Sequence, residues 1–200
     1  MSHLQRLVAA AVVAMILQLT PANAQFVTVP PVPADIQVEA GHVAFLKGHA
    51  IGTQNYACLP SGSSYAWTPI GPQATLFVDL PWNQPQQITT HFFSRNPQDG
   101  VIRPTWQGSF DTSAVWGAQV SMSTDPAYVQ AGAIPWLLLR AAGVKAGPSG
   151  GTLLAQTTFI HRLATTGGLR PATGCSQAGH VGAIVYVPYT ADYYFYKKDR

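Results

Sequence analysis

The chain has 200 residues, of which 11 are Lys or Arg and 8 are Asp or Glu, and its formal net charge is +3. Charged residues make up 10% of it, against ~25% in typical soluble domains. The basic residues are scattered apart from Lys197, Lys198 and Arg200 at the C-terminus, which excludes the basic stripe of a nucleic-acid-binding protein. The low charge also argues against a helical bundle, because the exposed faces of a bundle need Glu, Lys and Arg.

Residues 1–24 have the pattern of a secretory signal peptide. Arg6 precedes an uncharged apolar run, Leu7–Leu17, and Pro21 is followed by Ala22-Asn23-Ala24, an A-x-A cleavage pattern. The run is shorter than the ~20 residues that span a bilayer; a membrane anchor and a buried first helix are the alternatives. Cleavage would expose Gln25, not the Cys of a lipoprotein. We therefore expect a secreted or periplasmic protein with no transmembrane segment in the mature chain.

After the signal we expect a Pro-rich extended lead-in at residues 25–35 and a single β-rich domain at residues 36–200. Short β-like runs alternate there with Gly and Pro turn signals such as Gly48 and Gly71-Pro72, which is typical of a β-sandwich or barrel. The predicted strands are Ile36–Val38, Val43–Lys47, Ala50–Cys58, Ala66–Pro69, Thr75–Asp79, Ile88–Phe93, Ala114–Met122, Thr152–Leu163, Val181–Val187 and Asp192–Tyr196.

One short helix is predicted at Ile134–Gly143. Pro135 lies near its first turn and Gly143 just past its last, which is the usual asymmetry of helix ends. The residues between them are apolar enough to pack on a sheet. The expected fold class is therefore mostly β, a single-domain sandwich or barrel with one short helix and one disulfide.

The disulfide is expected between Cys58 and Cys175, the two cysteines of the chain. Export would place them in an oxidising compartment, where a disulfide forms by default; two buried free thiols are the alternative. Cys58 ends one predicted strand and Cys175 lies between two others. We expect these elements to be neighbours, with the two Cα atoms within the ~4.4–6.8 Å that a disulfide allows.

Motifs that indicate catalysis are weak. Gly147–Gly151 matches the G-x-S-x-G of serine hydrolases, but that turn needs a strand before it and a helix after it, and the predicted order here is the reverse. The histidines beyond residue 24 show none of the close spacings of a zinc site. No metal or cofactor is therefore expected, and a site assembled from distant strands is the alternative. Asp99-Gly100 and Asp125-Pro126 are explained by turns.

The segment around His161 and the aromatic residues leave two interpretations open. If residues 152–163 form a strand, His161 and Arg162 lie on opposite faces, and a buried structural histidine is a simpler interpretation than a site residue. The aromatic rings either fill the core or line a groove in which sugars stack. These rings are Trp67, Trp82, Trp106, Trp116, Trp136, Tyr186, Tyr189, Tyr193, Tyr194 and Tyr196.

A series of uncommon motifs extends from about Gly48 to Tyr196. The motifs are Gly52–Cys58, Trp67, Pro72–Phe77, His91-Phe92, Pro104–Trp106, Ile134–Leu139, Phe159–Gly168, Gly174-Cys175 and Val187–Tyr196. In this order they resemble the domain-of-unknown-function family 3455, a family of secreted bacterial and fungal proteins. The resemblance implies export, one domain and a Cys58–Cys175 pairing, and it supplies no activity. The chain departs from the family's pattern near Gly108–Asp111.

Six residues in these motifs are candidates for binding. They are Gln54, Tyr56, His91, Trp106, His161 and Arg162. The main hypothesis is a non-catalytic extracytoplasmic binding or envelope-associated domain, with a cell-envelope polysaccharide as one partner. The alternative is a secreted hydrolase or metalloenzyme built around His91 or His161. Convergence of the candidates in one cleft, and an acid beside a histidine, would distinguish the two hypotheses.

Overall fold

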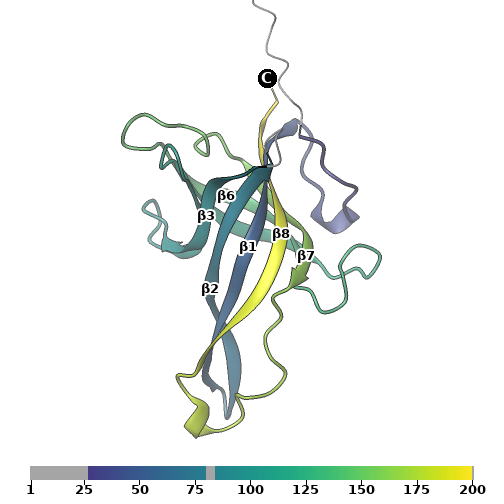
Figure 1. The fold of residues 1–200 in the computed structure, drawn as a ribbon, viewed down its shortest axis with the longest axis vertical. Coiled ribbons are helices and arrows are strands. Elements are labelled where there is room, and N and C mark those ends of the chain that lie inside the picture. The colour runs from purple at the N-terminus through teal and green to yellow at the C-terminus, as the bar shows by residue number, and fades with distance from the viewer. Residues whose placement is uncertain (1–26, 80–83, 200) are drawn as a thin grey trace, which may run out of the picture.

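The computed structural model describes residues 27–79 and 84–199, and the strands among them form one closed antiparallel barrel (Figure 1). Each strand pairs with the next along the chain, and β8 pairs with β1, so closure leaves no free sheet edge. The barrel form of the predicted fold class is thus the observed one. The predicted signal peptide lies outside the described residues. The strands are β1 (His42–Ser61), β2 (Ser64–Asp79), β3 (Pro85–Arg95), β4 (Ile102–Gly108), β5 (Ala114–Ser123), β6 (Trp136–Lys145), β7 (Phe159–Gly167) and β8 (Ile184–Lys198).

The helix predicted at Ile134–Gly143 is wrong, because this segment forms β6. Leu139 packs in the barrel interior, whereas Trp136 and Leu138 pack on the outside. Both faces of the strand are therefore apolar, and a continuous apolar run cannot be distinguished from a buried helix by its periodicity. Gly143 is not a helix cap: a Cβ there would lie 2.6 Å from Asn96 Oδ1, so the glycine allows a close approach.

Helices are otherwise limited to two three-residue 3-10 turns in the described residues, η1 (Ala34–Ile36) and η2 (Ala178–His180). The strand predicted at Ile36–Val38 is therefore also wrong. No helix in the described ranges is long and apolar enough to cross a membrane.

The observed strands are longer than the predicted ones. β1 continues through Gly48 and β2 through Gly71-Pro72, which we interpreted as breaks, and β8 joins the two strands predicted at Val181–Val187 and Asp192–Tyr196. β4 was not predicted. At Gly48 a Cβ would lie 3.0 Å from both Leu76 and Ile88, so this glycine makes room for neighbouring strands and does not end β1. β7 begins at Phe159, because residues 153–156 form a turn.

Two apolar clusters stabilise the barrel. The interior cluster includes the fully buried Leu76, Ile160 and Phe195, and it also contains Leu154 from the turn before β7. The outer cluster lies beneath residues 27–38, which contribute the fully buried Ile36 and the partly buried Val29. The predicted lead-in is thus folded against the barrel in the part that is described.

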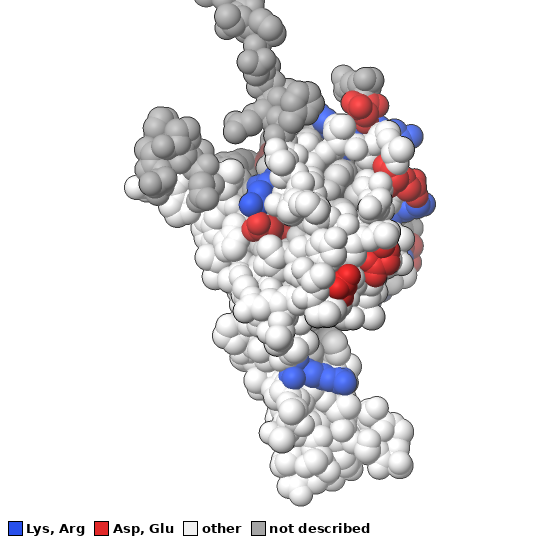
Figure 2. Space-filling view, turned by 90° about the vertical axis from the view of Figure 1, so that its right-hand side faces the viewer, with Lys and Arg blue, Asp and Glu red and all other residues white. Residues whose placement is uncertain are grey.

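The β1–β2 hairpin extends beyond the barrel, at the bottom of Figure 1, together with the loop before β8. We call residues 57–68 and 169–185 the arm. Cys58 and Cys175 form a disulfide there with a Cα–Cα distance of 5.5 Å, which confirms the predicted pairing and distance. Trp67 Nε1 also donates a hydrogen bond to Thr173 O (2.8 Å). Arg170 is the single Lys, Arg, Asp or Glu of the arm. On the face of the molecule seen in Figure 2, most of the charged side chains lie on the barrel, above the arm.

Asp111 joins the β4–β5 turn to the segment that carries Leu154. Its Oδ1 accepts hydrogen bonds from Ser113 N (3.0 Å) and Ser113 Oγ (2.8 Å), and its Oδ2 accepts one from Leu153 N (2.8 Å). Partial burial raises the pKa of Asp111, but the hydrogen bonds from Leu153 and Ser113 outweigh it, and the pKa lies below its usual value. The carboxylate therefore stabilises this end of the barrel.

We expect Asp111→Ala to lower the free energy of unfolding by about 2 kcal/mol, because three donors lose a charged acceptor. Urea denaturation at pH 7 measures this. Asp111→Asn, which keeps one acceptor oxygen, should fall between the wild type and the alanine variant. Equal stability of Asp111→Ala and the wild type would show that the turn does not depend on this carboxylate.

Candidate functional site

A cavity of about 310 Å³ lies inside the barrel, at the end nearer the arm. All eight strands contribute to its lining, together with Ile134 and Pro135 just before β6. The opposite end of the interior is filled by the core side chains around Leu154. Most of the lining is apolar: four prolines, several aliphatic side chains and a group of aromatic rings.

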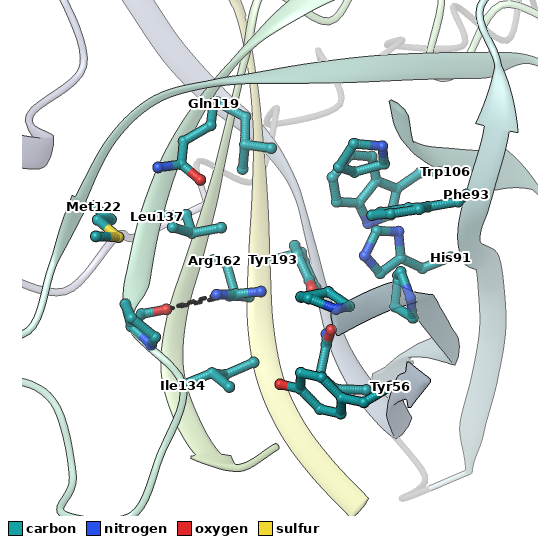
Figure 3. A pocket seen from close by; sticks show the side chains of 16 residues that line it. Tyr56, His91, Phe93, Trp106, Gln119, Met122, Ile134, Leu137, Arg162 and Tyr193 are labelled. Atoms are coloured by element: carbon teal, nitrogen blue, oxygen red, sulfur yellow. Dashed lines mark hydrogen bonds between the residues drawn. The ribbon is translucent and has the colours of Figure 1, made fainter. Parts of the chain in front are cut away.

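The aromatic group comes from adjacent strands. His91 of β3 and Trp106 of β4 are direct partners in the antiparallel register, and their rings stack with centroids 4.1 Å apart and planes 7° from parallel. Tyr193 of β8 meets both rings edge-on, at 5.2 and 5.3 Å. Figure 3 shows His91, Trp106 and Phe93 on one side of the cavity. Phe93 is 39% exposed and lies at the mouth, whereas Trp106 is buried.

His91 is held as a neutral ring. Its Nδ1 lies 2.9 Å from Thr105 O, and since a carbonyl only accepts, Nδ1 carries the proton. Burial lowers the pKa of His91 to about 3, against the smaller opposing effect of this hydrogen bond. In the neutral tautomer Nε2 is an acceptor. His91 therefore adds a polar atom but no charge near neutral pH.

Arg162 of β7 is the one formally charged side chain of the cavity lining. Its Nε and Nη2 donate to Pro135 O at 3.3 and 2.9 Å, and Figure 3 shows the guanidinium between this carbonyl and Tyr193. The four ion pairs found among the described residues all lie elsewhere and do not include Arg162. A positive charge is thus fixed beside an apolar cavity, and no carboxylate of the described residues forms an ion pair with it.

Two tyrosines of the lining, Tyr56 and Tyr193, are also neutral, as is Tyr189 next to them. Tyr56 OH donates to Gly168 O (2.7 Å), and the hydroxyls of Tyr189 and Tyr193 lie 3.3 Å apart. Burial raises the pKa of each of the three, and the positive charge of Arg162 opposes the rise. Their hydroxyls can therefore donate and accept hydrogen bonds, but they contribute no negative charge to balance Arg162.

Five of the six candidate residues line this one cavity: Gln54, Tyr56, His91, Trp106 and Arg162. His161 does not. As predicted, it lies on the opposite face of β7 from Arg162, here beneath residues 27–38. Its Nε2–H donates to Ile36 O (2.6 Å), and its Nδ1 accepts from Tyr196 OH (2.9 Å). Burial lowers the pKa of His161. The interpretation as a buried structural histidine fits this position.

The family is settled by comparison with known families. A family model described as protein of unknown function (DUF3455) matches residues 39–197. The chain belongs to this family. The DUF3455 match includes every residue that lines the cavity and all but the last residue of β8. A search of curated proteins and a search of solved structures found no match.

Several lining residues of this DUF3455 chain were not among the sequence candidates. Leu137 and Leu139 of β6 were assigned to the predicted helix, and Gln119 and Phe93 stood in predicted strands without a distinguishing motif. Alternation along each strand would have grouped Leu137 with Leu139, but Trp136 and Leu138 are equally apolar. No group of three or more potential metal-ligating side chains occurs in the part of the chain that the structure describes.

Proposed function

We propose that this DUF3455 chain is an exported, non-catalytic binding protein that holds one small, largely apolar molecule inside its barrel. The observation that carries this proposal is the cavity of about 310 Å³ lined by every strand. Ligand pockets typically measure ~300–1,000 Å³ and occur in the mouths of β-barrels. Eight strands also enclose an interior wide enough for one small ligand.

Two features support export. The N-terminal 24 residues have the pattern of a signal peptide. The chain also contains the Cys58–Cys175 disulfide. Disulfides persist in oxidising compartments and are rare in cytosolic proteins.

The geometry favours a small molecule over a cell-envelope polysaccharide. Trp106, Trp116 and Trp136 are all buried, so none of them offers an open face on which a sugar chain stacks. Trp67 is half-buried and its Nε1 already donates to Thr173 O. A binding site inside a closed barrel suits a compact ligand better than a polymer.

The enzyme alternative receives less support. The hydrogen-bond partners of His91 and His161 are two backbone carbonyls and a tyrosine hydroxyl, not carboxylates. A histidine general base normally needs an orienting acid and a pKa near the working pH. Ser149 of the G-x-S-x-G match lies in an exposed turn that a further turn follows, with no helix.

Ligand-observed NMR with a set of naphthalene derivatives tests the proposal. We expect several of these to bind the wild type. Gln119 lines the cavity (Figure 3) and is exposed, so Gln119→Trp places an indole in the lining and should weaken binding at least about tenfold. Val120→Trp is the matched control, because Val120 is the adjacent residue and is 52% exposed. If no compound binds the wild type, or if Gln119→Trp binds as well as Val120→Trp, the cavity is not the binding site.

A further inference from the structure

The charge balance of the cavity restricts the ligand further. Arg162 is partly buried and shows no ion pair with any acidic residue of the described chain. The only other titratable side chains of the lining are His91 and two tyrosines. Burial of an unpaired charge is costly, and the barrel could have placed an apolar side chain at this position. A bound anion would supply the missing partner.

We propose that the ligand carries a carboxylate on a flat apolar body, and that Arg162 binds this carboxylate inside the barrel. The inference rests on the proposed function, because it concerns the same cavity. It adds the sign of the ligand's charge, its chemical group and the residue that recognises it.

The hydrogen bonds of Arg162 prepare it for this role. Two of its nitrogens, Nε and Nη2, donate to the same acceptor, Pro135 O, which fixes the orientation of the guanidinium plane. The guanidinium fork matches the geometry of a carboxylate, and such charge-assisted bonds are roughly twice as strong as neutral ones. Pre-orientation by a backbone carbonyl reduces the entropy that a ligand would lose on binding.

The shape of the lining argues for a flat ligand body. The stacked pair His91–Trp106, Phe93 at the mouth and the proline rings present flat apolar surfaces. Aromatic surfaces of this kind prefer stacked or edge-on contacts with another ring. A single arginine matches the charge of a carboxylate, whereas a phosphate monoester carries nearly twice that charge.

Isothermal titration calorimetry of the purified protein at pH 7 tests the proposal with four naphthalene probes that differ in their polar group. The probes are 2-naphthoate, 2-naphthamide, 2-naphthyl phosphate and 2-naphthylmethylammonium. We expect 2-naphthoate to bind about 10- to 100-fold more tightly than 2-naphthamide, and the cation to bind most weakly. If the amide binds and the carboxylate binds no more tightly, this inference fails while the proposed function stands. If no probe binds, both fail, and if the phosphate binds most tightly, the assignment of a carboxylate is wrong.

Substitution of the arginine identifies the recognising residue. Arg162→Gln should abolish the preference for 2-naphthoate over 2-naphthamide, with the affinity for the amide retained. Arg140→Gln is the matched control: Arg140 lies on the neighbouring strand β6, and its ion pair with Glu39 is solvent-exposed on both sides. If Arg162→Gln fails to fold, Arg162→Met decides, since it removes the charge but keeps a long unbranched side chain. A selective loss of affinity for 2-naphthoate supports the proposal, and an unchanged preference overturns it.

Discussion

Removal of the Cys58–Cys175 disulfide is expected to lower the free energy of unfolding by about 5 kcal/mol, the largest single effect that we predict. The bridge closes a loop with a sequence separation of 117 residues, so it strongly restricts the unfolded chain. Because the strand pairings of β1 with β8 join the two ends of the barrel, the unfolded chain loses much entropy when it folds. For a chain of this size the expected fall in melting temperature is roughly 10–20 °C.

Differential scanning calorimetry with and without reductant measures this effect. The double variant Cys58→Ala, Cys175→Ala is the appropriate comparison, since Cys58 is fully buried and a serine there would bury a hydroxyl group. The melting temperature of the double variant should match that of the reduced wild type and should not respond to reductant. A wild type that melts at the same temperature in both conditions would contradict a stabilising role for the bridge.

His91 should make the stability of the barrel dependent on pH. Burial lowers the pKa of the folded-state ring to about 3, whereas the pKa of an unfolded-chain histidine is ~6.5. Between these values the unfolded state takes up a proton that the folded state does not. The contribution of the neutral ring is therefore complete above pH ~6.5 and declines as the pH falls, by about 1.4 kcal/mol per pH unit.

Urea denaturation from pH 6.5 to pH 4.5 measures this contribution by comparison with a variant that lacks His91. Asp99 and Asp111, whose pKa values are lowered, and His161, whose pKa burial also lowers, contribute equally to both proteins. In His91→Phe, which keeps a flat ring beside Trp106, the loss of stability over this range should be smaller than in the wild type by about 2–3 kcal/mol. The comparison uses the slope with pH, so it is unaffected by a constant loss of stability in the variant. His180→Phe removes a half-buried histidine of the arm, far from the cavity lining, and serves as the control. Equal slopes for His91→Phe and the wild type would mean that His91 titrates in the folded barrel.

The sequence was sufficient where a local pattern corresponds to one structure. The predominance of strands follows from many β-branched and aromatic runs separated by turn residues. The disulfide follows from two cysteines in a chain with an export pattern. The opposite orientation of His161 and Arg162 follows from the alternation of side chains along a strand, and it holds although the predicted start of that strand, Thr152, is seven residues too early.

The errors of the sequence analysis arise where two faces of one strand are buried for different reasons. β6 is apolar on its inner face because the barrel has a core, and apolar on its outer face because residues 27–38 cover it. Neither cause is visible in residues 134–143 themselves. The helix was predicted from Pro135 at the start of this segment and Gly143 at its end. The same holds for Gly48, which the sequence analysis interpreted as a turn signal. This glycine lies within β1 and leaves room for Leu76 and Ile88 of neighbouring strands, which its local sequence does not reveal.

By itself, the sequence determined a low-charge, β-rich chain with one disulfide, and it marked six candidate residues, five of which line the cavity. Only the tertiary structure decided that the sheet closes into a barrel, that a cavity of about 310 Å³ remains inside, and that Arg162 lines it without an acid while His161 is outside. The physical reason is that side-chain alternation and turn chemistry act over a few residues. Closure, cavity volume and the pairing of charges depend on strands that are distant in the chain, such as β1 and β8, or β3 and β7.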